Sequence, residues 1–204
     1  MKILLAAAAV GSLALAGSAS AATIFTDDFV NAAYGANVTP AGWTTTDGTV
    51  EGLGPAFFGG LCTSGGSADQ YCVDLDGSTN DAGVMTRAFS LQGGTTYIAS
   101  FDLAGSQRGD LNSITVTFGG ASATYSLASA DAFSTRTLSF TPTTNGAYSL
   151  SFANAGGDNV GVLLDRVSIA AGGVPEPATW AVMLLGFFGL GSTLRVRRAQ
   201  RALA

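Results

Sequence analysis

The 204-residue chain contains no histidine, and its single lysine, Lys2, stands near the N-terminus. Serine and cysteine nucleophiles in catalytic triads and dyads depend on a histidine or lysine base. Zinc and iron sites with imidazole ligands are excluded for the same reason. A hydrolase built from this sequence would have to work with carboxylates alone.

Glutamate is almost absent as well. Glu51 is the only glutamate between residues 22 and 174, and its nearest acidic neighbour in the sequence is Asp47. A glycosidase needs two carboxyl groups about 5 to 10 Å apart, one of them with a raised pKa. Nothing in the sequence distinguishes this pair of acids, so we expect a protein that is not an enzyme. A glycan hydrolase that uses only carboxylates is the alternative.

Positive charge is scarce in the middle of the chain. Residues 22–174 contain four arginines against twelve aspartates and one glutamate, a formal charge of −9, whereas the whole chain carries −5. A strongly acidic surface repels phosphate backbones, so we expect no nucleic-acid partner. Divalent cations or neutral sugars suit such a surface better.

The N-terminal segment has the pattern of a signal peptide. Lys2 provides the positive charge, residues 3–15 form a short apolar stretch, and Ala19-Ser20-Ala21 offers small residues at a cleavage site. We expect residues 1–21 to be removed by cleavage before Ala22 during export. An uncleaved membrane helix is the alternative, but the apolar stretch is short for one.

The C-terminal segment combines three elements in a fixed order. Residues 171–177 are a short linker that ends in the motif Pro175-Glu176-Pro177, and residues 178–194 are apolar and uncharged. Seventeen residues at about 1.5 Å each give roughly 26 Å of helix, at the short limit for crossing a membrane. Trp180 would lie at the outer interface. The basic tail, residues 195–204, would stay cytoplasmic through Arg195, Arg197, Arg198 and Arg201.

This order of elements resembles the PEP-CTERM sorting signal of exported proteins in Gram-negative bacteria. The resemblance covers the tail and implies an exosortase-type membrane enzyme as a partner. It also implies that the precursor is anchored in the inner membrane until the helix is removed near the Pro-Glu-Pro motif. The remaining protein would then reach the cell surface or the extracellular space. An ordinary C-terminal membrane anchor is the alternative interpretation.

Cys62 and Cys72 are the only cysteines of the chain. An even pair in an exported protein predicts a disulfide. A redox-active pair would favour a Cys-x-x-Cys spacing and basic neighbours that lower the thiol pKa, and neither is present. We therefore predict a structural disulfide that closes a ring of about eleven residues.

Between residues 22 and 170, apolar residues alternate with a period of two over short stretches, which predicts antiparallel strands with one buried face. The residues expected to face the core are Tyr97, Ala99, Phe101 and Leu103; Ile114, Val116 and Phe118; Ala123, Tyr125 and Leu127; Leu138 and Phe140; and Tyr148, Leu150 and Phe152. Further strands are expected at residues 24–29, 44–50, 71–76, 84–91 and 160–169.

Turn signals separate these strands, and Asn145-Gly146 is expected to form a hairpin turn between Phe140 and Tyr148. About nine or ten strands at this spacing predict an all-β fold, a single antiparallel β-sandwich over residues 22–170. A jelly roll is the expected strand order, and an immunoglobulin-like sandwich is the alternative.

Several short stretches resemble the galactose-binding-like jelly rolls of secreted bacterial choice-of-anchor domains. They are residues 26–29, 42–43, 74–77, 96–105 and 164–169. The resemblance covers most of the expected sandwich and implies a jelly-roll fold and contact with carbohydrate. A fold alone does not name a ligand, however.

Acidic and amide side chains gather in one loop as Asp74, Asp76, Asn80 and Asp81, and Asp102 could approach them from a neighbouring strand. Oxygen ligands of this kind suit Ca²⁺, which takes about six to eight of them. Asp and Asn are also common in turns, because their side chains cap the local backbone. Both interpretations stay open, so a structural calcium ion is the one candidate cofactor.

A sugar-binding surface needs exposed aromatic rings with polar groups around them. Tyr34, Trp43 and Tyr71, and with them Phe57 and Phe58, lie in the irregular first half of the chain, where loops could expose them. The alternative for each is the sandwich core, the commoner place for large apolar side chains. Tyr34, Trp43 and Tyr71 are the candidate ligand-binding residues.

These features predict a non-catalytic, exported protein of the cell surface or extracellular matrix. We expect it to bind polysaccharide or other matrix components, in the context of a biofilm or exopolysaccharide. A purely structural adhesion module without a ligand site is the alternative.

Overall fold

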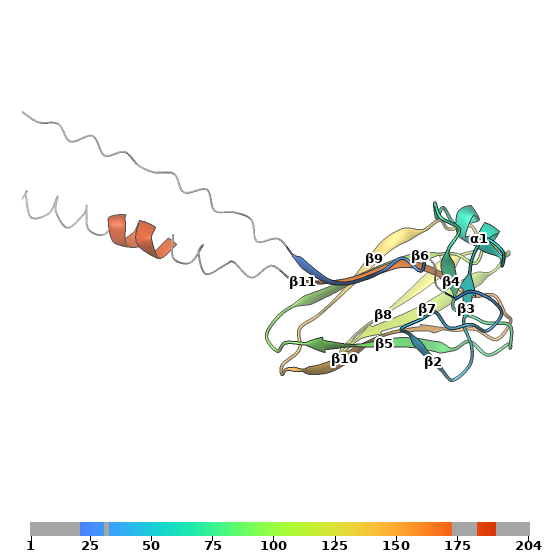
Figure 1. Cartoon of the computed structure of the whole chain (residues 1–204), viewed down its shortest axis with the longest axis horizontal. Coiled ribbons are helices and arrows are strands. Elements are labelled where there is room, and N and C mark those ends of the chain that lie inside the picture. The colour runs from blue at the N-terminus through green and yellow to red at the C-terminus, as the bar shows by residue number, and fades with distance from the viewer. Residues whose placement is uncertain (1–20, 31–32, 173–182, 191–204) are drawn as a thin grey trace, which may run out of the picture. The chain divides into compact units, whose positions relative to one another are not determined.

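Alternating apolar residues build the inner faces of two antiparallel sheets (Figure 1). The structure, a computed structural model, describes residues 21–30, 33–172 and 183–190. Residues Ala21–Gly172 form one compact unit, and both sheets belong to it. The predicted β-sandwich is confirmed.

The larger sheet has six strands. They are β1 (Ala22–Asp27), β3 (Glu51–Leu53), β4 (Cys72–Asp74), β6 (Tyr97–Ala104), β9 (Ser134–Phe140) and β11 (Leu163–Ala171). Their order is β3-β4-β11-β6-β9, and β1 also pairs with β11. We call this the six-stranded sheet.

The second sheet has five strands. They are β2 (Thr44–Thr46), β5 (Val84–Leu91), β7 (Leu111–Phe118), β8 (Ala121–Ala128) and β10 (Gly146–Asn154). Their order is β2-β5-β10-β7-β8. A short helix, α1 (Gly59–Ser64), lies between β3 and β4 in the chain.

The chain changes sheet at almost every connection from β4 to β11. β4, β6, β9 and β11 lie in the six-stranded sheet, and the strands between them, β5, β7, β8 and β10, lie in the other. This repeated crossing is the strand order of a jelly roll, which combines two Greek keys. The immunoglobulin-like alternative is therefore excluded.

The predicted hairpin turn at Asn145-Gly146 is wrong. β9 pairs with β6, whereas β10 pairs with β5 and β7, so the connection passes from one sheet to the other. Neither residue has the positive φ that such a hairpin requires. The side chain of Asn145 instead accepts a hydrogen bond from the N–H of Gly93 at 2.9 Å, which ties two loops together. The tight hairpin lies between β7 and β8, at Gly119 with φ +55°.

The main core lies between the sheets. The residues predicted to face it from β6, namely Tyr97, Ala99, Phe101 and Leu103, are all buried. Phe101 meets Phe152 of the other sheet edge to face, with ring centroids 5.4 Å apart. Burial of such rings contributes about 25 cal/mol per Å² of apolar surface, which makes the sandwich a rigid base for its loops.

A smaller apolar cluster lies around the disulfide. Cys62 of α1 is bonded to Cys72 of β4, so the predicted disulfide is confirmed. The buried residues of this cluster are Leu53, Cys62, Cys72, Ala104 and Leu163, and Phe57, Leu61 and Phe133 pack against them. The disulfide and the cluster together fix α1 to the end of the six-stranded sheet where β3 and β4 lie (Figure 1).

Residues 183–190 are helical. Within the described residues, no helix is long and apolar enough to cross a membrane. The predicted signal peptide, the Pro175-Glu176-Pro177 motif, Trp180 and the basic tail with Arg195, Arg197 and Arg198 lie outside the described residues. The same holds for parts of the predicted span at residues 178–194. Export, sorting and membrane insertion stay predictions.

Candidate functional site

Two pairs of aromatic side chains meet around Gly54, the residue that follows β3. Tyr34 packs against Tyr71 with ring centroids 6.1 Å apart, and Phe57 packs against Phe58 at 4.8 Å. Gly54 and Phe57 exchange two backbone hydrogen bonds, of 3.0 and 2.8 Å. A Cβ atom on Gly54 would lie 2.6 Å from the ring of Tyr34, so both pairs touch the same backbone. We call these four aromatic residues the aromatic cluster.

The aromatic cluster is open to solvent. Phe58 is 64% exposed and Tyr34 is 39% exposed, while Phe57 and Tyr71 are half-buried. In the described part of the chain, the hydroxyl groups of Tyr34 and Tyr71 have no hydrogen-bond partner. Single exposed apolar side chains are common, but large apolar rings that gather in one patch of the surface often mark a site of interaction.

Phe58 holds its exposed ring through an unusual backbone. It precedes α1 with φ 51° and ψ 18°, in the left-handed region. A bulky residue in this region costs on the order of 1 to 3 kcal/mol, and such residues gather at functional sites. The backbone at Phe58, directly before α1, is therefore held in a strained conformation.

Tyr71 is fixed from both sides. Its N–H donates to Oδ1 of Asp69 at 3.0 Å. The next residue is Cys72, whose disulfide partner Cys62 lies in α1 four residues after Phe58. The disulfide thus connects the segment that carries Phe57 and Phe58 to the segment that carries Tyr71. Rings that are held in place before binding lose less entropy when a ligand arrives.

Trp43 does not belong to this surface. It is 6% exposed, and its ring packs against Phe29 and Phe152 at centroid distances of 6.3 and 5.8 Å. Its indole N–H donates to Oδ2 of Asp27 at 2.8 Å, so its polar group is satisfied inside. The prediction that Trp43 binds a ligand is wrong, because its large side chain fills the core.

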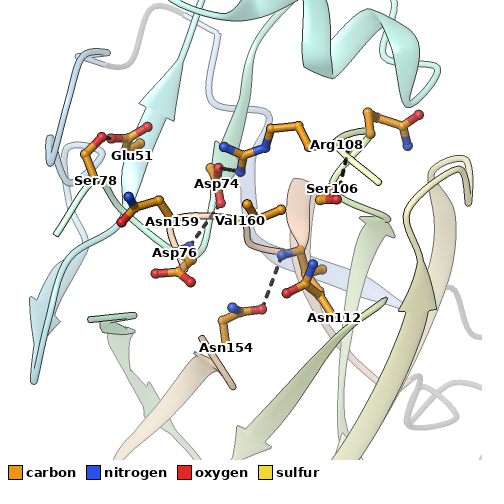
Figure 2. Close-up of polar contacts among 12 residues, drawn as sticks. Glu51, Asp74, Asp76, Ser78, Ser106, Arg108, Asn112, Asn154, Asn159 and Val160 are labelled. Carbon is orange, nitrogen blue, oxygen red and sulfur yellow. Dashed lines mark hydrogen bonds and ion pairs between the residues drawn. The ribbon is translucent and has the colours of Figure 1, made fainter. Parts of the chain in front are cut away.

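The predicted calcium ligands do not come together as one group. Asp74 and Asp76 are neighbours, and the N–H of Asp76 donates to Oδ1 of Asp74 at 3.0 Å (Figure 2). Asn80 and Asp81 are exposed, and Asp102 lies on β6, two strands away from β4. Among the described residues, no group of three or more acidic or cysteine side chains could hold a metal ion. The expectation that Asp102 approaches the others is wrong.

Asp76 nevertheless has an oxygen free for a ligand. Its side chain is buried, at 1% exposure, and Oδ2 accepts a hydrogen bond from the N–H of Gly157 at 3.1 Å. Its Oδ1 and the Nδ2 atom of Asn154 are buried without a partner among the described residues. An unpaired buried polar atom is costly, and a bound water or a cation would satisfy it. Structural calcium stays a prediction.

A carboxylate with a raised pKa lies in the same buried region (Figure 2). Burial raises the pKa of Asp74 to about 7, although its ion pair with Arg108 opposes the shift. Glu51 lies opposite Asp74 across β3 and β4, and it accepts a hydrogen bond from Ser78. Glycosidases use two carboxyl groups, one of which has a raised pKa. Because both side chains are buried, neither reaches a sugar at the surface.

No protein-family model and no curated protein matches the chain. Solved structures do match. The CBM22-1 xylan-binding domain of Paenibacillus barcinonensis Xyn10C aligns with a TM-score of 0.55 at 11% identity, over 78% of this chain and 99% of that domain. The K1 cleaved adhesin domain of Lys-gingipain from Porphyromonas gingivalis aligns with a TM-score of 0.50 at 14% identity, over 73% of this chain and 98% of that domain.

A third structure contains both a binding module and a catalytic module. It is the N-terminal CBM22-1 and GH10 part of the Clostridium thermocellum endo-1,4-beta-D-xylanase 10B, complexed with xylohexaose. It aligns with a TM-score of 0.50 at 14% identity, over 74% of this chain but only 29% of that one. At these identities the three likenesses show a shared jelly-roll fold and do not transfer a ligand.

Proposed function

We propose that this protein is a non-catalytic, exported module that binds polysaccharide at the cell surface or in the extracellular matrix. The observation that carries the proposal is the aromatic cluster of Tyr34, Phe57, Phe58 and Tyr71. Aromatic rings present an apolar face to the C–H face of a sugar ring, and the free tyrosine hydroxyls can bond its hydroxyl groups. A rigid sandwich with binding residues in its loops suits such a site.

Two further observations support this proposal over a hydrolase. Asp74 and Asp165, whose pKa values are raised, are both buried, and Asp74 is also paired with Arg108. One of the structural neighbours, the CBM22-1 domain of Xyn10C, is itself described as a xylan-binding domain. The formal charge of −9 over residues 22–174 favours a neutral polysaccharide over an acidic one.

Replacement of Tyr71 by alanine should weaken binding to a neutral oligosaccharide by roughly tenfold or more, because it removes a central ring of the site. The full-length protein is first screened on a glycan array, and the affinity for the best ligand, with xylohexaose included, is then measured by calorimetry. Leu111→Ala is the matched control, because Leu111 is an exposed apolar side chain on β7, outside the aromatic cluster.

Three outcomes of this experiment are informative. Loss of binding in Tyr71→Ala with full binding in Leu111→Ala supports the proposal. Absence of binding to any glycan would favour a structural adhesion module. Release of reducing ends from the polysaccharide by the protein would favour the carboxylate hydrolase.

We further propose that the C-terminal segment is a PEP-CTERM-type sorting signal that an exosortase-type enzyme processes. The order of Pro175-Glu176-Pro177, the apolar residues 178–194 and the arginines after them supports this proposal. Protein recovered from outside the cell should therefore lack residues 180–204, as measured by intact mass. Retention of these residues on the exported protein would contradict processing and favour an ordinary anchor.

A further inference from the structure

A polar site separate from the aromatic cluster lies on the six-stranded sheet, where β1 pairs with β11. Arg166 of β11 has φ 44°, a left-handed value that is unusual for a side chain inside a strand. The register between β11 and β6 shifts between Asp165 and Ser168, so Arg166 lies in a β-bulge. Bulges redirect a side chain and are common beside functional sites.

The side chain of Arg166 is anchored along one edge. Its Nε donates to Oδ2 of Asp102 at 2.7 Å, and its Nη2 lies 2.6 Å from the same oxygen. Thr135 donates to the other oxygen of Asp102 at 2.6 Å. Asp102 is buried, whereas the side chain of Arg166 is 55% exposed. Among the described residues Nη1 has no partner, so the fixed guanidinium keeps N–H groups free on its open side.

Arg166 lines a cavity of about 250 Å³. The lining residues are Thr26, Asp27, Asp28, Arg166, Val167 and Ser168. Thr26 and Ser168 are direct cross-strand partners, so their side chains lie on the same face of the sheet. Within the described chain neither hydroxyl has a hydrogen-bond partner. We call this cavity the Arg166 pocket.

The two aspartates of the Arg166 pocket differ in their free oxygens. Asp27 uses both, accepting from the N–H of Phe29 at 3.0 Å and from the indole of Trp43 at 2.8 Å. Asp28 accepts from the N–H of Val30 through Oδ1 at 3.2 Å, which leaves Oδ2 available. The pocket therefore offers N–H donors, two hydroxyls and one carboxylate oxygen on fixed backbone elements.

The Arg166 pocket suits neither kind of ion. Asp102 already balances the arginine, so the carboxylates of Asp27 and Asp28 repel an anion. A metal cation would find a single free carboxylate oxygen, that of Asp28, and the described residues contain no group of three acidic side chains that could hold it. An uncharged molecule with several hydroxyl groups matches the donors and acceptors that remain. The cavity is slightly below the roughly 300 to 1,000 Å³ of ordinary small-ligand sites, so it suits one sugar ring rather than an oligosaccharide.

We propose that the Arg166 pocket binds one uncharged sugar residue through hydrogen bonds, as a site built from other residues than the aromatic cluster. The two sites would bind sugars through different interactions. The aromatic cluster offers ring faces for stacking, and the Arg166 pocket offers hydrogen-bond donors and acceptors. The pocket therefore discriminates among sugars by the positions of their hydroxyls. Its occupancy does not depend on the proposed polysaccharide binding at Tyr71.

The test uses the full-length protein in detergent micelles and follows the Arg166 Nε–H signal by NMR. Addition of D-xylose or D-glucose up to on the order of 100 mM should shift this signal with millimolar affinity. D-glucuronate differs from glucose by a carboxylate in place of the hydroxymethyl group, and it should bind about tenfold more weakly because of Asp27 and Asp28.

A double variant, Thr26→Val with Ser168→Ala, removes both hydroxyls without leaving a buried charge. We expect it to bind the neutral sugar about fivefold more weakly, the loss of one to two hydrogen bonds. Thr115→Val is the control. Thr115 and its hydrogen-bond partner Thr124 both lie in the five-stranded sheet, away from the Arg166 pocket. Tyr71→Ala should leave the sugar-induced shift unchanged, which separates this proposal from the one on the aromatic cluster.

Any of three results would overturn the proposal. They are the absence of a shift with every neutral sugar, equal affinity in the double variant and the wild type, and tighter binding of glucuronate than of glucose. The last result would indicate an anion site instead.

Discussion

Removal of the disulfide, in the variant Cys62→Ala with Cys72→Ala, should lower the free energy of unfolding by about 2 to 3 kcal/mol and abolish binding at the aromatic cluster. The first effect follows because a ring of about eleven residues is no longer closed in the unfolded chain. The second follows because Phe58 directly precedes α1 and Tyr71 directly precedes β4, and the disulfide is the covalent link between α1 and β4.

Urea unfolding and oligosaccharide titration on the same samples separate the two effects. The wild type treated with a thiol reductant is a control that keeps the sequence unchanged, and it should resemble the double variant. A variant that loses stability but binds the oligosaccharide with full affinity would show that the apolar contacts around Leu53 and Leu163 hold the aromatic cluster without the disulfide.

The inner faces of the sandwich follow from the sequence because each strand obeys a local rule. Apolar residues two positions apart must share one face, and the structure buries Ile114, Val116 and Phe118 as that rule requires. β5 spans Val84–Leu91, the bounds expected from the sequence, although its pattern is less regular. The number and spacing of the strands made a jelly roll the expected order, and a family resemblance added support, but the periodicity itself does not tell which strands pair.

Elements that depend on distant contacts could not be predicted in this way. α1 has six residues, too few for a helical pattern, and β3 has three, one of them a glycine. Both are stabilised by the disulfide and by burial against Leu163, which is about 100 residues away in the chain. Asn145-Gly146 has the composition of a hairpin turn, but the pairing of β10 with β5 overrides that local preference.

The candidate site was predictable in part for the same reason. Tyr34 and Tyr71 both lie in the irregular first half of the chain, Tyr71 at the start of the expected strand 71–76, so their exposure was one of the outcomes that the sequence allowed. Trp43 lies in an equally irregular stretch, yet the partners that bury it, Phe29 and Phe152, come from distant segments. The Arg166 pocket depends on a bulge in β11, and no local sequence signal marks that bulge.

The buried acids should make the protein less stable as the pH rises from about 4 to 7. Burial raises the pKa of Asp74 to about 7 and that of Asp165 to about 6, against 3.8 for an exposed aspartate. The folded state therefore holds protons that the unfolded state has already released. Because the folded state binds more protons in this interval, the free energy of unfolding falls with increasing pH. The stabilisation from these protonated acids is complete below about pH 4. It is lost as the pH rises through about 6 for Asp165 and about 7 for Asp74.

Asp74→Asn isolates the larger of these contributions. Asparagine resembles the protonated acid in shape and keeps an oxygen for the N–H of Asp76. Relative to the wild type, the variant should gain on the order of 3 kcal/mol in unfolding free energy between pH 5 and pH 8, since each unit of pKa shift corresponds to about 1.4 kcal/mol. Urea unfolding at a series of pH values measures this difference. Asp81→Asn is the control, because Asp81 is exposed and should give a difference that does not change with pH. A difference between Asp74→Asn and the wild type that is equally flat would mean that Arg108 keeps Asp74 ionised throughout, with the ion pair outweighing the cost of burial.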